Sequence, residues 1–166
     1  MTAPAAGSPA SPPPDSIPIG EIGVAQGCGV LRMLVGSCVA LVLHAAHHRA
    51  CGVAHVMLPA STGRRTSPGK YADTAVAETL RLLQEVTQDP DVSCTAKLVG
   101  GAAMFAFRGG VPIGEQNVTA IERILGERGI EIVGRDCGGG HGRRVIVDVA
   151  TGAVTVATAE HGTQTL

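Results

Sequence analysis

Gly36, Ser37 and Cys38 interrupt a long apolar run, and His55 lies in the next apolar segment. A cysteine attacks a carbonyl only as its thiolate, so a nucleophilic Cys38 would need a nearby base such as an imidazole. A strand-to-helix turn at Gly36 would offer backbone N–H groups to an oxyanion and a helix N-terminus to a thiolate. In the other interpretation Cys38 is a small buried thiol and His55 an ordinary strand histidine, and spacing alone favours this one.

A second group of side chains suits metal chemistry by type, since imidazoles and a thiolate are zinc ligands. Its members are His44, His47, His48 and Cys51. Their spacing matches no closed zinc site, and the segment resembles a turn between two strands. We therefore expect solvated turn histidines, no metal ligand and no cofactor.

Glycine runs form the third candidate: Gly100-Gly101, Gly109-Gly110 and the segment 138–142. A phosphate-binding loop needs a pattern such as GxGxxG or GxxxxGK[ST] between a strand and a helix. Neither pattern occurs, so we interpret these runs as tight turns.

The elements that must position these residues follow from hydrophobic periodicity. Apolar residues at helical spacing predict helices over 71–87 and about 114–128, the second ending at Gly129. The apolar run 30–43 is predicted to bend at Gly36-Ser37, and further strands are predicted over 52–58, 130–136, 143–149 and 153–159, with 95–105 a strand followed by a glycine bend. Thr151-Gly152 marks a hairpin between the last two strands. The expected fold is α+β of a layered α/β type, a single domain with a mixed sheet packed against two main helices.

Composition bounds the domain and its partners. The 166 residues carry 13 Lys and Arg against 14 Asp and Glu and only three aromatic side chains, which argues against nucleic-acid binding. No apolar run reaches the roughly 18 residues of a membrane span. Five cysteines without a CxxC pair, and no basic residue before Arg32, favour reduced thiols in the cytoplasm. We expect a disordered Pro/Ala-rich tail over 1–17, the domain over 18–160 and a flexible C-terminus over 161–166.

Taken together, the motifs resemble the CheD family of chemoreceptor glutamine deamidases. They are LVGSCVALVL, GVAHVMLP, PGKYADTAV, AKLVGGAAMF, IGEQN, DCGGGHGR-V and TGAV, in the family's order over about residues 19–158. The resemblance implies hydrolysis of receptor glutamines to glutamates, with methyl-ester hydrolysis credited to some members. It places the family's nucleophile on Cys38 and its histidine on His55.

The chain departs from the family at Arg32, where members have an active-site threonine, and at Gln116, where they usually have arginine. A guanidinium cannot accept the imidazole N–H, so either a carbonyl, a water or a residue from elsewhere orients His55, or the activity is weakened. Arg143 keeps the arginine that follows the glycine run in the family.

The resemblance also implies partners. These are the cytoplasmic helices of chemoreceptors and a CheC-type phosphatase. The loop 60–70, with Arg64, Arg65 and Lys70, is a candidate contact for acidic receptor helices, and a merely solvated loop is equally compatible with its composition. Arg32 favours the alternative function, a non-catalytic regulator that binds receptors and the phosphatase.

Overall fold

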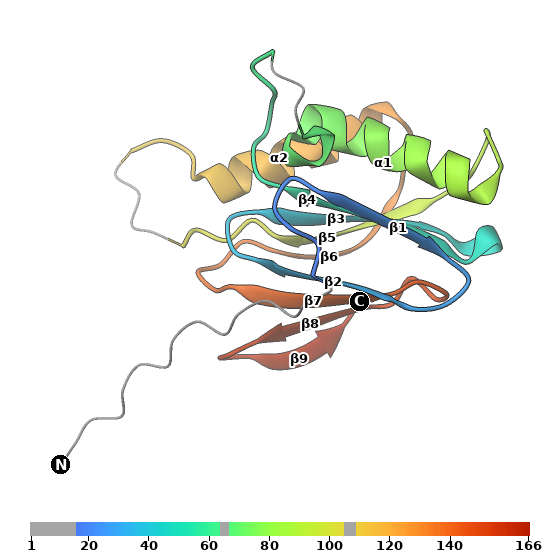
Figure 1. The fold of residues 1–166 in the computed structure, drawn as a ribbon. Helices are drawn as coiled ribbons and strands as arrows, with labels where there is room; N and C mark the ends of the chain where they lie inside the picture. The colour runs from blue at the N-terminus through green and yellow to red at the C-terminus, as the bar shows by residue number, and fades with distance from the viewer. Residues whose placement is uncertain (1–15, 64–66, 105–108) are drawn as a thin grey trace.

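The computed structural model describes residues 16–63, 67–104 and 109–166. In this part of the chain nine β-strands and two α-helices form three layers, with the helices on one face of a five-stranded sheet and a four-stranded sheet on its other face (Figure 1). The predicted α+β class, with two main helices in a single domain, is confirmed. Arg64 and Arg65 of the proposed receptor contact lie outside the described residues, as does Phe105 at the end of the predicted segment 95–105.

The five-stranded sheet has the order β1-β4-β3-β5-β6. Its strands are β1 (Ile22–Gln26), β3 (Val39–Ala45), β4 (Ala50–Val56), β5 (Thr95–Gly100) and β6 (Ile132–Cys137). The pairings are antiparallel except for β5 with β6, which a helical crossover joins in parallel. The central strand β3 is apolar on both faces because it lies between two packed layers.

The four-stranded sheet is antiparallel, in the order β2-β7-β8-β9. Its strands are β2 (Val30–Val35), β7 (Arg143–Asp148), β8 (Val154–Thr158) and β9 (Gly162–Thr165). The predicted hairpin at Thr151-Gly152 joins β7 to β8. There Asp148 Oδ1 accepts hydrogen bonds from the Thr151 N–H and hydroxyl at 2.8 and 2.9 Å.

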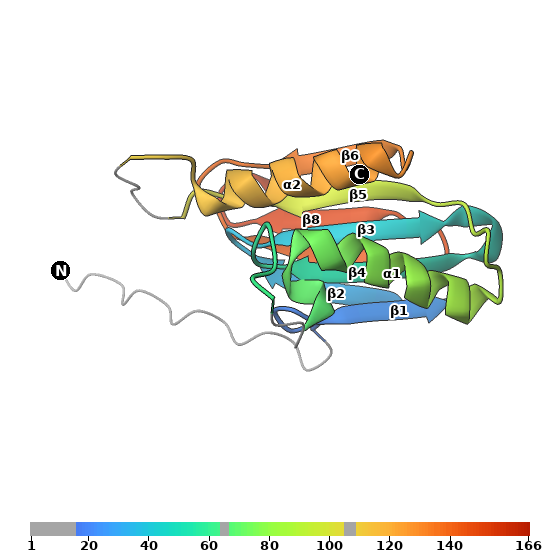
Figure 2. The ribbon, with the colours of Figure 1, turned by 90° about the horizontal axis from the view of Figure 1, so that it is seen from above.

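Helices α1 (Ala72–Thr87) and α2 (Ile113–Glu127) lie next to each other along the same face of the five-stranded sheet (Figure 2). Their apolar faces, with Leu83 of α1 and Leu125 of α2, form one core with strand residues such as Leu41. A second aliphatic core fills the space between the sheets. Among the described residues no helix combines the length and apolarity needed to cross a bilayer.

Two predicted boundaries need correction. Ile17, assigned to the tail, is only 9 % exposed, and its N–H donates to the Arg32 carbonyl at 2.7 Å. The segment 161–166, expected to be flexible, contains strand β9, which pairs with β8. The residues of β9 are polar and exposed, so the sequence lacks the alternation of apolar and polar residues that would have predicted a strand here. The structure also contains β1, which the sequence did not predict.

The bend at Gly36 leads from β2 into β3 and therefore carries the chain from one sheet to the other. Gly100, at the end of β5, packs against this bend with φ +119°, and a Cβ placed there would lie 2.3 Å from the Cys38 carbonyl oxygen. Only glycine permits this approach, since any side chain would push the two segments apart.

We predict that Gly100→Ala lowers the free energy of unfolding by about 1–3 kcal/mol more than Gly29→Ala does, as measured by urea denaturation. Gly29 is a matched control because it has a similar φ of +116°, and a Cβ placed on it would have no neighbouring atom within 4 Å. Equal losses in the two variants would show that backbone strain, and not the contact with Cys38, governs the cost.

Candidate active site

Cys38 lies at the crossing between the two sheets, directly before β3, and is partly buried. Backbone hydrogen bonds fix the bend on both sides of Ser37. The Gly36 carbonyl accepts from Ala102 N–H at 2.9 Å, and the Cys38 carbonyl accepts from Gly101 N–H at 2.8 Å. The bend enters a strand and not a helix, so the helix N-terminus expected to stabilise a thiolate is not there.

His55 lies on β4 beside this bend. It pairs directly with Ala40 of β3, and Cys38 is two residues before Ala40. Side chains two residues apart on a strand share a face, so Cys38 and His55 are diagonal neighbours on the face turned toward the four-stranded sheet. Backbones at such diagonal positions are about 7–8 Å apart, close enough for side chains to interact. The register of β3 and β4 thus places the two residues singled out in the sequence at the same end of the sheet and on the same face.

A backbone carbonyl orients the His55 ring. His55 Nδ1 lies 3.0 Å from the Ile17 carbonyl oxygen. Because a carbonyl only accepts, Nδ1 carries the proton and Nε2 keeps its lone pair. Nε2 is buried and has no hydrogen-bond partner among the described residues, and the whole residue is 4 % exposed. The imidazole is therefore held in the tautomer that a general base needs.

Arg32 supports this arrangement through its backbone. Its carbonyl accepts the Ile17 N–H, and Ile17 in turn accepts the His55 N–H. On β2 the Arg32 side chain alternates with those of Met33 and Val35, which enter the core between the sheets, so it leaves the strand on the opposite face. In this chain the carbonyl of Ile17 is therefore the group that orients the imidazole.

Burial sets the resting protonation of the pair. It raises the pKa of the Cys38 thiol and lowers the pKa of His55, and the hydrogen bond to Ile17 opposes the second effect. Both shifts favour the uncharged forms because a low-dielectric site penalises charge. The resting site is a thiol beside a neutral imidazole.

Asn117 on α2 connects the two halves of the site. Its side chain is fully buried, and its Nδ2 donates to the carbonyls of Ser37 at 3.2 Å and Met57 at 2.9 Å. It thereby ties the bend before Cys38 to the end of the strand that carries His55. No role for Asn117 was predicted from the sequence. The sequence did offer one signal: Asn117 is a polar residue on the same helix face as Ile121, which is the apolar face.

Arg143 shapes the glycine loop over 138–142. The side chain is almost entirely buried, and Nη2 lies 3.0 Å from Asp136 Oδ1 while Nη1 donates to the His141 carbonyl at 3.2 Å. The Ala103 N–H donates to the Gly139 carbonyl at 2.8 Å, and Ala103 directly follows Gly101 and Ala102, which bond to the bend. The arginine therefore secures the loop that packs behind the bend.

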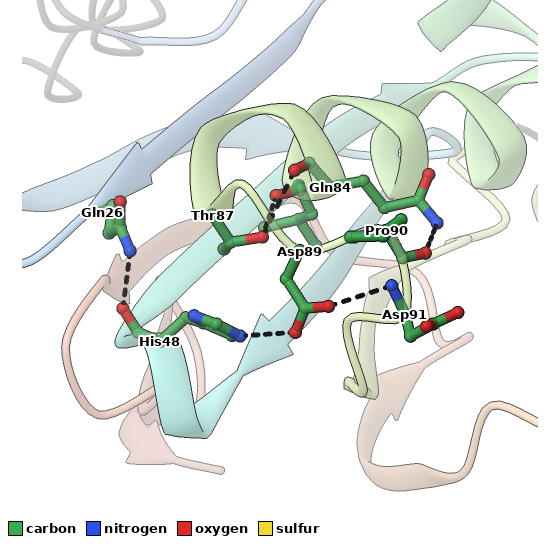
Figure 3. Close-up of polar contacts among 8 residues, drawn as sticks. Gln26, His48, Gln84, Thr87, Asp89, Pro90 and Asp91 are labelled. Atoms are coloured by element: carbon green, nitrogen blue, oxygen red, sulfur yellow. Dashed lines mark hydrogen bonds and ion pairs between the residues drawn. The ribbon is translucent and has the colours of Figure 1, made fainter.

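The histidine group at 44–51 lies at the opposite end of β3 and β4 from Cys38. His48 Nε2 lies 2.8 Å from Asp89 Oδ2 in the turn after α1, and the His48 carbonyl accepts from Gln26 (Figure 3). Burial raises the pKa of Cys51 to about 12, which keeps its thiol protonated. Among the described residues none of these side chains takes part in a group of three metal ligands.

The fold and this site define a three-layer α+β protein with a cysteine and an oriented, buried histidine on one sheet face. The family model described as "CheD chemotactic sensory transduction" matches residues 57–158. The chain belongs to the CheD family.

Two relatives illustrate the similarity. The chain is 39 % identical over 142 residues to a "Probable chemoreceptor glutamine deamidase CheD" of Methanococcus maripaludis, covering 84 % of this chain and 92 % of the relative. It is 38 % identical over 149 residues to the "Chemoreceptor glutamine deamidase CheD" of Thermotoga maritima, covering 89 % and 94 %.

We predict that Asn117→Ala lowers the free energy of unfolding by about 1–3 kcal/mol, because two carbonyls lose their shared donor. Gln116→Ala is the matched control, since Gln116 is the exposed preceding residue and bonds only locally, to the Val111 carbonyl. Its effect should stay within about 0.5 kcal/mol in the same denaturation assay. If both variants are equally stable, Asn117 does not hold the bend and the strand end together.

Proposed function

We propose that this protein is a glutamine deamidase that converts chemoreceptor glutamine side chains to glutamate in chemotaxis signalling, in the cytoplasm. The names of its relatives support the reaction and the substrate. The observation that carries the assignment of residues is the buried, unpartnered Nε2 of His55 on the same sheet face as Cys38. No cofactor takes part in the proposed reaction.

The first step starts from the neutral pair. As Cys38 Sγ attacks the side-chain carbonyl carbon of glutamine, His55 Nε2 takes the thiol proton. The carbonyl oxygen becomes an oxyanion in a tetrahedral intermediate. The N–H groups of Ser37 and Cys38 donate to no other described residue, so they are the donors we assign to this oxyanion.

The second half of the reaction returns the enzyme to its starting state. The imidazolium gives its proton to the departing amide nitrogen, which leaves as ammonia, and a Cys38 thioester remains. Water attacks the thioester while His55 takes a proton from it, and the glutamate carboxylate is released as the thiol is restored. A receptor methyl ester would follow the same route with methanol as the leaving group.

The surroundings of the site suit a protein substrate. Several exposed large apolar side chains belong to segments that border the site: Ile19, Met57, Met104, Val111 and Ile113. Met104 lies over Gly36, in a groove of about 720 Å³ that also includes Arg143 and Arg144. Arg143 is buried and paired with Asp136, so the exposed Arg144 is the basic group that this groove offers to a partner. An apolar groove beside such a group fits one face of an amphipathic, acidic receptor helix.

The alternative function is a regulator that binds receptors and a CheC-type phosphatase without catalysis. Arg32 was the feature that favoured it, because the family's threonine hydroxyl is absent. The hydrogen bond from His55 to Ile17 supplies an orienting acceptor without that hydroxyl. We therefore place the catalytic function first.

We predict that Cys38→Ala reduces deamidation of receptor cytoplasmic fragments by at least about 10³-fold, since no other group can form the thioester. Mass spectrometry detects the product as a gain of about one dalton per glutamine. Cys28→Ala, which removes an exposed thiol, is the control and should retain full activity. Full product from Cys38→Ala would overturn the assignment, and receptor binding without deamidation by the wild type would favour the regulator.

The lowered pKa of His55 predicts where activity is lost in acid. His55 accepts a proton only when neutral, so the rate falls as pH drops through its pKa. Because burial lowers that pKa, the acid limb of kcat/KM should lie below the ordinary imidazole value of about 6.5. A measured limb at or above this value would contradict a neutral resting base.

His55→Gln should lower the rate of deamidation by about 10²–10⁴, because the variant lacks the general base.

A further inference from the structure

Three side chains with metal-ligating atoms converge away from Cys38 and His55. His141 lies in the glycine loop between β6 and β7, while Glu160 and His161 lie in the turn between β8 and β9. One ligand atom from each lies within 4.8 Å of the others. The two segments are nearly twenty positions apart in the sequence, so their proximity could not be predicted from it.

The β8–β9 turn holds two of these residues on a defined backbone. Thr158 pairs with Gly162, which leaves a three-residue connection. The His161 N–H donates to Thr158 Oγ1 at 3.0 Å, and Gly162 has φ +72°, as expected at the end of such a turn. Glu160 and His161 are thus presented together at the tip of a hairpin.

The loop that carries His141 is fixed separately. Arg143 donates to the His141 carbonyl and pairs with Asp136, which also accepts from Gln164 Nε2 of β9 at 2.7 Å. These contacts tie the glycine loop to the strand that follows the turn. Because Asp136 compensates the charge of Arg143, the guanidinium opposes a nearby cation only weakly.

The donor atoms already approach one another. His141 Nε2 lies 3.3 Å from Glu160 Oε2, and the rings of His141 and His161 meet edge to face with centroids 5.2 Å apart. An ion pair explains the first contact but not the placement of His161. Around a zinc ion with bonds of about 2.0–2.1 Å, ligand atoms lie about 3.4 Å apart. Glu160 and His161 are exposed and His141 is partly buried, so small rotations of the two exposed side chains complete the set.

We propose that His141, Glu160 and His161 form a binding site for a zinc ion. Two imidazoles and one carboxylate are a zinc ligand set, and three protein ligands leave a fourth position open to water or another ligand. The bound ion would connect the glycine loop to the β8–β9 turn. Since the Gly139 carbonyl accepts from Ala103, it would also stiffen the support behind the Cys38 bend.

The test is calorimetric titration of the reduced, metal-free full-length protein with zinc chloride. We expect one saturable equivalent for the wild type. His141→Ala and His161→Ala should each weaken zinc binding by at least about tenfold. Removing a group that only orients a ligand already costs about that much in metal affinity, and removing the ligand itself costs no less. Glu160→Gln, which removes the carboxylate charge, should weaken zinc binding as well.

Two control variants separate this site from others on the chain. His47→Ala removes an exposed histidine outside the group, and Cys38→Ser removes the thiol that could bind zinc with His55. Both should bind like the wild type, and zinc should raise the unfolding midpoint of both but not of His161→Ala. Undiminished binding in His141→Ala and His161→Ala, or its loss in Cys38→Ser, would overturn the proposal. None of these results depends on deamidase activity.

Discussion

The structure depends on one close backbone approach, where the end of β5 meets the bend between β2 and β3. Gly100, Gly101 and Ala102 pack on the bend, and the last two donate hydrogen bonds to the carbonyls of Cys38 and Gly36. This contact joins the two sheets at the point where the chain passes from one to the other. It also fixes Cys38, so the stability of the fold and the position of the sulfur rest on the same hydrogen bonds.

Local patterns explain which parts of the fold could be predicted. The helices and most strands carry their own periodicity, and the Gly-Ser break before Cys38 marks the bend. Ile17 and β9 could not be predicted, because a partner from elsewhere in the chain orders each of them: Arg32 for the first, β8 for the second. The role of Asn117 was hidden for the same reason, since its two acceptors lie 80 and 60 positions away.

Arg32 contributes to the site through its backbone, which holds the segment that orients His55. A hydroxyl at that position can act only if the residue is serine or threonine. A carbonyl on a neighbouring segment acts whatever side chain it carries, and here the backbone of Arg32 holds that segment in place. The orientation of the imidazole is therefore a property of the chain path, and less of the residue types along β2.

The bond between Ile17 and His55 also limits how far the chain can be shortened without changing the surroundings of the imidazole. A chain shortened to start at residue 18 would keep the residues of every strand and helix described, but it would lose the buried Ile17 side chain from the core between the sheets. It would lack the carbonyl that fixes the proton on Nδ1, so the imidazole could exchange tautomers and present Nε2 protonated. Ile17, which belongs to no strand, thus decides which nitrogen of the His55 imidazole carries the proton.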